Sequence, residues 1–186
     1  KIIFLPNTYQ CNDSTKKISE KVFKREELGL PKKGFVFCCF NQSFKITPNV
    51  FDIWMNILRN VDNSVLWLFE DNLPAKKNLI EETKQRGINS NRIVFAKKMP
   101  LYEHLARHKF ADLFLDTFPY NAHTTCSDAL WSGLPVLTCM GESFASRVSA
   151  SLLKAIDLSE LITKTQKTYE NLAIKIAKNP DYLKKI

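Results

Sequence analysis

Glycine is scarce in this chain, since only five of its 186 residues are Gly. The dinucleotide-binding pattern G-x-G-x-x-G is absent, and so is the P-loop pattern G-x-x-x-x-G-K-[ST], which argues against both of these phosphate-binding loops. The G-x-S-x-G pattern of α/β-hydrolases is absent too. A phosphate site in this protein therefore has to be built without a glycine-rich loop.

Long apolar runs and paired cysteines are also missing. No run approaches the ~18 apolar residues of a membrane span, and no signal-peptide pattern is present, so we expect no membrane partner. The five cysteines are odd in number and lie in no metal-binding or C-x-x-C spacing, which predicts free, mostly buried thiols in a reducing, cytoplasmic compartment. Because the chain begins at Lys1 rather than Met, we expect it to be part of a longer protein.

The net charge is +8, but the basic residues are scattered in pairs such as Lys16-Lys17 and Lys97-Lys98. They form no dense stripe, and no RNP, homeodomain or zinc-finger pattern accompanies them, so nucleic acid is not an expected partner. A solvated lysine-rich surface and the binding of a small polyanion, such as a nucleoside diphosphate, both remain open.

The chain divides at residue 34. Residues 1–33 hold a short apolar run, a polar loop and a charged, weakly helical stretch, and we interpret them as a linker into the domain at 34–186. Apolar runs rich in β-formers predict strands at 35–41, 64–70, 92–97, 111–117 and 135–139. Helices are predicted between and after them, at 47–61, 75–86, 101–109, 124–132 and 142–155, with two more pieces in 166–186 broken by Pro180.

Fully apolar strands that alternate with helices are typical of a parallel sheet covered on both faces. The right-handed crossover rule then predicts an α/β, Rossmann-like doubly wound domain. Ligands bind such sheets outside the carboxyl ends of the strands. The segments that follow the strands are therefore the candidates for a site, and they begin at residues 41, 97, 116 and 140.

The segment after the fourth predicted strand carries His123, Thr124 and Thr125 at the start of a helix. Unpaired N–H groups at a helix start, two hydroxyls and an imidazole together suit a diphosphate. Asp128 lies one turn further on the same face, where its carboxylate suits the two hydroxyls of a ribose. Either threonine alone would be read as a simple helix cap.

Three other side chains are weaker candidates. His104 and Arg107 share one face of a short helix, where the imidazole suits hydrogen bonding to a flat base and the guanidinium suits stacking on it. His108 lies off that face and is expected to be exposed. Lys45, three residues after Gln42, is placed to stabilise negative charge on a leaving phosphate, although alone it is only a surface lysine.

The motifs F-N-Q-x-x-K (40–45) and H-T-T-x-x-D (123–128), with the stretches "MPLYEHLARH", "GESFASRVSASLL" and "YENLAIKIAKNPDYLKKI", resemble the carboxyl-terminal catalytic lobe of the O-linked N-acetylglucosamine transferase family. This is glycosyltransferase family 41, in its bacterial tetratricopeptide-repeat type. The resemblance covers essentially all 186 residues, and "KIIFLPNTYQCND" is similar to the linker before that lobe.

The resemblance implies the C-terminal lobe of a GT-B enzyme that uses a UDP-sugar, inverts the anomeric centre, needs no metal or other cofactor and glycosylates proteins or peptides. It also implies a missing amino-terminal lobe, which would carry the catalytic base, and upstream repeats. By resemblance Lys45 is catalytic and stabilises the leaving UDP, while the donor is bound by Gln42, Lys45, the Met99 backbone, His104, Arg107, His123, Thr124, Thr125 and Asp128.

Two positions bear on the nucleotide and the sugar. Leu101 stands where the animal enzymes have a ribose-contacting lysine. His123 favours UDP, since the related plant fucosyltransferases use GDP-fucose and lack this histidine. A UDP-glucose or GDP-fucose protein glycosyltransferase, and a non-catalytic nucleotide-binding or interaction module, stay open as alternatives.

Overall fold

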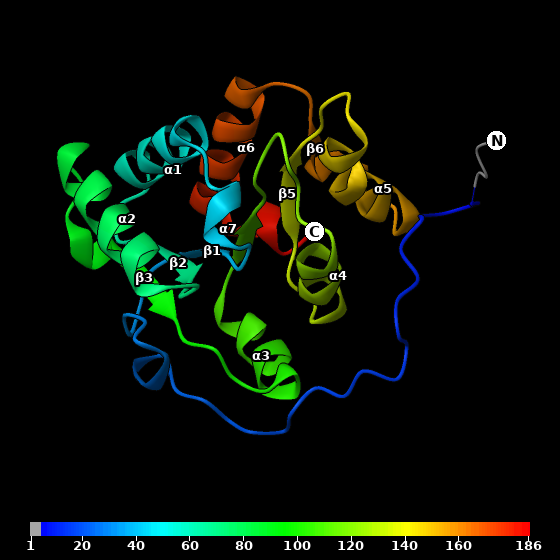
Figure 1. Cartoon of the computed structure of the whole chain (residues 1–186), viewed down its shortest axis with the longest axis horizontal. Helices are drawn as coiled ribbons and strands as arrows, with labels where there is room; N and C mark the ends of the chain where they lie inside the picture. Colours follow the sequence, from blue (N-terminus) through cyan, green and yellow to red (C-terminus); the bar gives the residue numbers. More distant parts are fainter. Residues whose placement is uncertain (1–4) are drawn as a thin grey trace.

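The computed structural model of the protein describes residues 5–186, so the first four residues of the expected linker lie outside it. Six parallel strands form one sheet in the order β3-β2-β1-β4-β5-β6 (Figure 1). Their bounds are β1 (Val36–Cys39), β2 (Val65–Phe69), β3 (Ile93–Ala96), β4 (Leu113–Leu115), β5 (Val136–Cys139) and β6 (Ile162–Thr163). The strand order reverses between β1 and β4, as in a Rossmann-like doubly wound sheet, and this confirms the predicted fold class.

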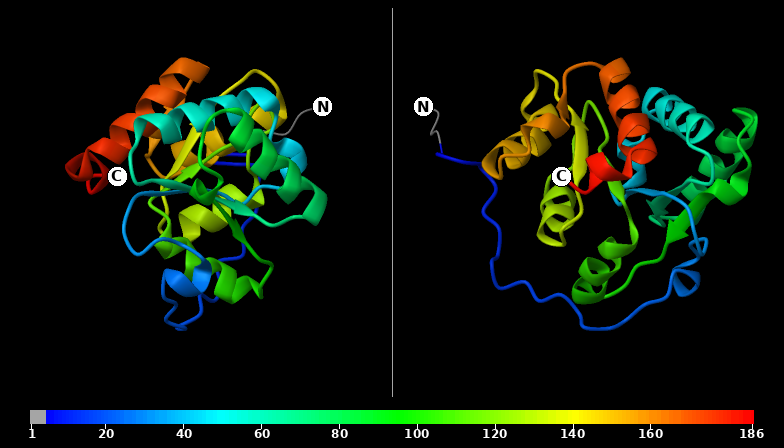
Figure 2. Two further views of the ribbon diagram at one scale, coloured as in Figure 1. Left: turned by 90° about the vertical axis from the view of Figure 1, so that its left-hand side faces the viewer. Right: turned by 180° about the vertical axis from the view of Figure 1, so that it is seen from behind.

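Helices cover both faces of the sheet. Right-handed crossovers put α1 (Pro48–Asn60) and α2 (Leu73–Gln85) on one face, where α6 (Gln166–Lys178) packs against α1. The other face carries α3 (Leu101–Arg107), α4 (Thr124–Trp131) and α5 (Val148–Ala155), as the two further views in Figure 2 also show. A last helix, α7 (Pro180–Leu183), starts at the proline that was expected to break the carboxyl-terminal segment.

Most helix starts follow from local capping. The Thr47 hydroxyl accepts a hydrogen bond from the Val50 N–H, and Pro48 occupies the first turn of α1, as predicted. Asn72 caps α2 in the same way by accepting from the Ala75 N–H. The helix therefore begins at Leu73, two residues before the predicted start, because its capping asparagine precedes a Leu-Pro first turn.

The helix predicted at 142–155 is wrong in its first half. A 3-10 turn at Phe144–Ser146 comes first, and α5 begins only at Val148. The Ser143 side chain caps this turn through the Ser146 N–H. A Cβ on Gly141 would lie 2.7 Å from the Ser146 hydroxyl oxygen, so the chain folds back too tightly there for a continuous helix.

The amino-terminal segment differs from its predicted weak helix. Apart from a 3-10 turn at Glu26–Leu28, residues 5–33 form neither helix nor strand. Phe23 is buried, but the neighbouring Val22 is exposed, so the stretch has no continuous apolar face to bury. Helical propensity alone is not enough to form a helix in water. The segment instead runs along the molecule past α5, α4 and α3 (Figure 1, dark blue).

One buried tyrosine ties α1 and α6, on one face of the sheet, to the end of β4. The Tyr169 hydroxyl on α6 donates to the Asp116 backbone oxygen at 3.0 Å and accepts from the Trp54 indole N–H at 3.2 Å. All three residues are fully buried. This contact fixes the carboxyl end of β4, from which the loop to α4 departs.

The cysteines are free and mostly buried, as predicted. All five cysteines are free, and four of them are buried, whereas Cys11 is exposed. Within residues 5–186, no helix combines the length and the apolar character needed to cross a bilayer.

Candidate functional site

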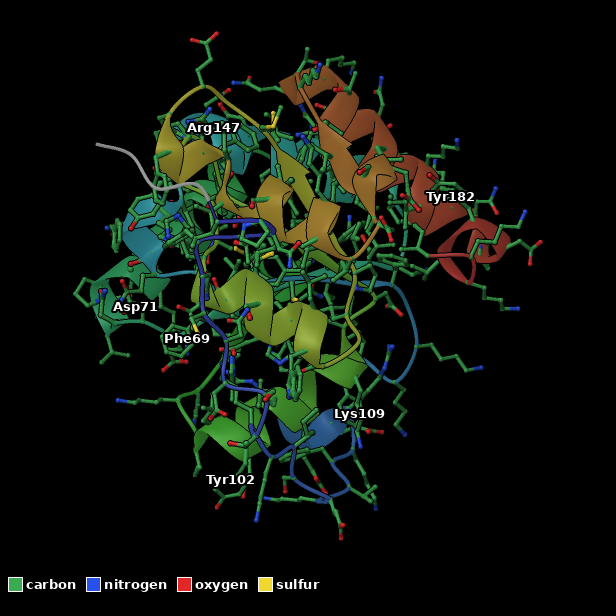
Figure 3. All side chains as sticks on the ribbon, turned by 90° about the vertical axis from the view of Figure 1, so that its right-hand side faces the viewer. Phe69, Asp71, Tyr102, Lys109, Arg147 and Tyr182 are labelled. Carbon is green, nitrogen blue, oxygen red and sulfur yellow. The ribbon has the colours of Figure 1, made fainter. Side chains whose placement is uncertain are left out.

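A cavity of about 720 Å³ opens where the strand order reverses, between the carboxyl ends of β1 and β4. This is the place where doubly wound sheets bind ligands. Its walls come from the end of β2, from the loops after β1, β3 and β4, and from α3 and α4: Phe40, Asn41, Gln42, Phe44, Lys45, Phe69, Lys98, Met99, Leu101, His104, Arg107, Tyr120, His123, Thr124 and Thr125. In Figure 3, the labels Phe69 and Asp71 mark the carboxyl end of β2 and the start of the loop after it, beside this cavity.

Asn41 joins the two loops that meet at the cavity. Its side chain is buried, donates to the Thr117 hydroxyl at 2.8 Å and accepts from the Thr125 hydroxyl. The Thr117 hydroxyl in turn donates to the Tyr120 backbone oxygen at 2.7 Å. The loop after β1 and the first turn of α4 are therefore held in one hydrogen-bonded arrangement.

Lys45 reaches the cavity from the 3-10 turn Ser43–Lys45. Its ammonium donates to the Asn121 backbone oxygen at 3.0 Å and lies 3.9 Å from the centroid of the Tyr120 ring. Burial lowers the Lys45 pKa, while the Asp116 carboxylate acts to raise it. A half-buried cation fixed at the cavity wall is suited to stabilise negative charge that develops on a bound group.

Asp116 shapes the loop that leads from β4 to α4. Its carboxylate is fully buried and accepts hydrogen bonds from the Ala122 N–H at 2.6 Å and from the Thr138 hydroxyl at 2.7 Å. Burial raises the pKa of Asp116 to about 6, against the lowering effect of these hydrogen bonds. Because this hydrogen bond fixes the backbone at Ala122, it also fixes where His123 and α4 begin relative to the sheet.

The amino terminus of α4 is not capped by a side chain. His123 occupies the N-cap position, and its side chain makes no capping hydrogen bond. Neither threonine is the cap, which answers the simpler interpretation of this motif. Thr124 is exposed and lines the cavity together with His123 and Thr125, so the uncapped first turn of α4 lies at the cavity wall and suits an anion.

Beside this terminus, the His123 imidazole is fixed from both sides. Nδ1 lies 2.9 Å from the Tyr9 hydroxyl, and Nε2 lies 3.5 Å from the Ala145 backbone oxygen. Burial lowers the His123 pKa, and the Lys45 charge acts in the same direction. A neutral imidazole with one fixed N–H is suited to donate to a phosphate oxygen.

The end of the cavity next to α3 is lined by aromatic and basic side chains. The His104 and Phe40 rings lie 5.1 Å apart, and burial lowers the His104 pKa to about 3, so this imidazole is neutral at physiological pH. Met99 and Leu101 complete this wall. The surface suits the flat, uncharged face and edge of a nucleobase.

Arg107 does not stack on the open cavity as the sequence suggested. Its guanidinium lies over the protein's own Phe40 and Trp67 rings, 4.9 and 5.7 Å from their centroids, and only 1% of the residue is exposed. One arm donates to the Lys97 backbone oxygen at 2.7 Å, which orients the strand end before Met99. Nε and Nη2 are buried and have no hydrogen-bond partner in the described part of the chain.

The expectation that His108 is exposed is wrong. Its side chain is buried, and its Nδ1–H donates to the His104 backbone oxygen at 2.8 Å. The α-helix tightens into a 3-10 turn at His108–Phe110, which turns the imidazole inward against Phe40. Burial lowers the His108 pKa to about 4, so this second neutral imidazole packs beside the neutral imidazole of His104.

Asp128 is the one predicted site residue that does not line the cavity. It lies one turn along α4 from Thr124, as expected, but its carboxylate is paired with the Lys16 ammonium at 2.6 Å. The other eight predicted residues meet at the cavity: Gln42, Lys45, Met99, His104, Arg107, His123, Thr124 and Thr125.

Several wall residues were not singled out from the sequence. Phe44 and Tyr120 form an exposed aromatic rim, with ring centroids 6.1 Å apart, and Phe144 stands beyond His123 at 6.3 Å. Phe44 lies within the F-N-Q-x-x-K motif, so its place next to Lys45 was the available signal. Within residues 5–186, no three His, Cys, Asp or Glu side chains are grouped so that they could hold a metal ion.

Comparison with known proteins gives a consistent family. The family model described as glycosyl transferase family 41 matches residues 7–186. The UDP-N-acetylglucosamine–peptide N-acetylglucosaminyltransferase of Caenorhabditis elegans is 40% identical over 159 residues, which are 86% of this chain and 14% of that protein. The probable enzyme of the same name, SEC, from Arabidopsis thaliana is 35% identical and covers 96% of this chain and 19% of its own length. This chain therefore spans less than a fifth of these relatives.

Solved structures share the fold. A mutant O-GlcNAc transferase of Thermobaculum terrenum superposes with a TM-score of 0.78 at 33% identity, covering 82% of this chain and 30% of that one. A putative UDP-N-acetylglucosamine 2-epimerase of Listeria monocytogenes superposes with a TM-score of 0.57 at 12% identity, which indicates a common fold alone.

Proposed function

Because this chain belongs to glycosyltransferase family 41 and has the fold of the C-terminal lobe of a GT-B enzyme, we propose that it is the donor-binding lobe of an inverting protein glycosyltransferase. The donor is a UDP-sugar, with N-acetylglucosamine as the sugar, and the acceptor is a Ser or Thr hydroxyl of a protein. One observation carries this proposal: a neutral aromatic wall, an uncapped helix start and a fixed lysine line one cavity at the strand reversal.

The uracil, the diphosphate and the sugar of the donor each have their own place in the cavity. The uracil lies against His104 and the Met99 backbone, at the neutral end of the cavity. The diphosphate lies at the start of α4, where backbone N–H groups, the Thr124 hydroxyl and the His123 imidazole donate to its oxygens. The sugar then points toward Gln42, Lys45 and the aromatic rim of Phe44 and Tyr120.

Transfer breaks the bond between the anomeric carbon and the β-phosphate oxygen, and the acceptor oxygen bonds to the opposite face of the sugar. The acceptor proton passes to a base on the companion lobe. The departing UDP gains negative charge, which Lys45 and the first turn of α4 stabilise more strongly than they stabilise the bound donor. With a lysine and a helix terminus available for this charge, we expect no metal requirement.

The companion lobe, upstream repeats and a cytoplasmic location are parts of the same proposal. The companion lobe is supported by the length of the relatives, of which this chain spans 14% and 19%, whereas the repeats and the location rest on the family resemblance. The boundary between linker and lobe at residue 34 stays a prediction, and so does the absence of nucleic-acid and membrane partners.

Titration calorimetry of the 186-residue chain with UDP and GDP tests the proposal. We expect saturable UDP binding that does not need Mg²⁺ and exceeds GDP binding. A preference for GDP, or no binding of either nucleotide, would contradict it. Titration with UDP-N-acetylglucosamine and UDP-glucose then separates the two sugars, and turnover by the intact protein separates an enzyme from a binding module.

A further inference from the structure

Residues 7–21 form an extended strap that ties together the three helices at the ligand edge of the sheet. It contacts α5, α4 and α3 in turn: Ser151 Oγ donates to the Asn7 backbone oxygen at 3.3 Å, Ser127 Oγ donates to Asn12 Oδ1 at 2.7 Å, and the Ser19 N–H donates to the Tyr102 backbone oxygen at 3.0 Å. Figure 3 shows the strap crossing beside α4 and descending to α3, where Tyr102 is labelled.

The strap ends its passage over α4 with an ion pair. Lys16 Nζ lies 2.6 Å from Asp128 Oδ1, and the two side chains are only 17% and 8% exposed. The Trp131 indole N–H donates to the Lys16 backbone oxygen at 3.2 Å, which fixes the lysine from the next turn of α4. The Asp128 carboxylate is thus nearly buried. The positive charge that balances it comes from Lys16 in the strap, not from residues 34–186.

The ion pair leaves hydrogen-bonding capacity on both partners. Only Oδ1 of Asp128 receives the ammonium, and Oδ2 has no partner among residues 5–186. An ammonium has three donors, of which one is used here. Asp128 lies one turn beyond Thr124 and outside the cavity wall, so a ribose hydroxyl has to extend past Thr124 to donate to Oδ2, which it can do while the ion pair stays intact.

Seven residues before Lys16, Tyr9 of the strap contacts His123 at the ligand edge. The Tyr9 hydroxyl lies 2.9 Å from His123 Nδ1, and the Tyr9 ring packs edge-on against Phe144 with centroids 4.8 Å apart. His123 Nε2 faces the Ala145 carbonyl oxygen, which only accepts hydrogen bonds, so Nε2 carries the proton. Nδ1 is then the acceptor and the Tyr9 hydroxyl is the donor.

We propose that the strap is part of the donor site, with Lys16 and Tyr9 as positioning residues. Lys16 holds the Asp128 carboxylate against the ribose hydroxyls, and Tyr9 holds His123 in the tautomer protonated at Nε2, whose N–H exchanges its long, 3.5 Å contact with the Ala145 oxygen for a diphosphate oxygen. This inference rests on the proposed function, since it assigns residues to the binding of the same UDP-sugar. The Lys16 ammonium would thus lie beside the ribose, whereas the α3 side of the cavity offers only the uncharged Leu101 side chain.

Binding of UDP and 2′-deoxy-UDP to Lys16 variants tests the first contact. Lys16→Met should weaken UDP binding about tenfold, the size expected for one charge-assisted hydrogen bond, and should weaken 2′-deoxy-UDP binding less. Lys16→Arg should restore most of the affinity and the preference for UDP. Lys17→Met is the matched control, because Lys17 is exposed on the same strap.

Three outcomes would overturn the role of Lys16. Unchanged or tighter UDP binding by Lys16→Met would mean that the lysine is idle or blocks Asp128. Equal losses for UDP and 2′-deoxy-UDP, or a Lys16→Arg variant no better than Lys16→Met, would indicate a purely structural contact. A wild-type chain that binds no UDP would instead refute the proposed function itself, so the two failures are distinguishable.

The Tyr9 contact has a spectroscopic signature. Long-range ¹H–¹⁵N correlation of the ring nitrogens should show His123 protonated at Nε2 in the wild-type chain, and Tyr9→Phe should weaken this preference and reduce UDP affinity without reducing uridine affinity. Tyr102→Phe is the control, because that ring is exposed on α3. An Nδ1-protonated wild-type His123, or a Tyr9→Phe variant with unchanged tautomer and UDP affinity, would overturn this half of the inference.

Discussion

The Lys45 ammonium lies over the face of the Tyr120 ring, 3.9 Å from its centroid, although the two residues come from different loops. The hydrogen bond to the Asn121 backbone oxygen holds it there at 3.0 Å. A cation in this position is partly desolvated and already oriented, so it has little freedom to lose when charge develops next to it. Its energetic contribution is therefore expected in the transition state rather than in the ground state.

Replacing Lys45 by Met in the intact protein should lower kcat by ~10²–10³, the typical effect of removing one group that stabilises developing charge. UDP affinity should change much less, because the helix start and the threonines still hold the diphosphate. Steady-state kinetics and UDP titration give the two numbers. Lys97→Ala, at an exposed lysine outside the cavity wall, is the control. A loss of affinity as large as the loss of kcat would contradict this role.

The two threonines of α4 should respond differently to removal of the hydroxyl. Thr124 makes no side-chain hydrogen bond within residues 5–186, whereas the Thr125 hydroxyl donates to buried Asn41. Thr124→Val should reduce UDP affinity by about tenfold or more and leave stability unchanged, as expected for loss of a hydrogen bond to a charged phosphate. Thr125→Val should also lower the free energy of unfolding, by ~1 kcal/mol.

Calorimetry with UDP and urea unfolding of both variants separate these effects. The pair serves as its own control, since the substitutions are identical and the sites are adjacent. Equal loss of stability in the two variants would show that the Asn41 contact does not distinguish them.

Much of this site followed from local sequence patterns. Apolar runs predicted five strands, and the sequence patterns around them supplied six of the predicted residues that line the cavity, whereas Gln42 and Met99 came from the family resemblance. The sixth strand, Ile162–Thr163, is too short to produce such a run. Lys16 and Asp128 are 112 positions apart, and Tyr9 and His123 are 114 apart, so no periodicity links them. The inward turn of His108 depends on packing against Phe40, which a helical wheel does not contain.

His104 and His108 should be neutral at pH 6.5, and all three histidines should have lowered pKa values. Burial lowers the pKa of His104 to about 3 and of His108 to about 4, and it also lowers that of His123. In a ¹H NMR titration the Hε1 signals of His104 and His108 should therefore shift below pH 5, and the His123 signal should shift at a lower pH than that of an ordinary histidine. In urea, where burial is lost, all three should titrate near the usual 6.5. A His104 signal that titrates near pH 6.5 in the folded chain would contradict a neutral wall for the base.

Asp116 should give a pH dependence of stability that is opposite to ordinary acid denaturation. Burial raises its pKa from the ordinary 3.8 to about 6, so between these values the folded chain binds more protons than the unfolded chain. The free energy of unfolding contributed by Asp116 therefore falls as pH rises from about 4 to about 6, by roughly 3 kcal/mol in total.

Asp116→Asn removes this titration but keeps an oxygen that can accept from the Ala122 N–H. Relative to wild type, the variant should thus gain stability between pH 4 and pH 7, even if it is less stable than wild type at pH 4 because the Thr138 hydroxyl must reorient. Urea unfolding of both chains at the two pH values measures this difference, with Asp181→Asn, an exposed carboxylate on α7, as the control. A stability difference that stays constant across this range would show that Asp116 is ionised at both pH values in the folded chain, held by the hydrogen bonds from Ala122 and Thr138 against the effect of burial.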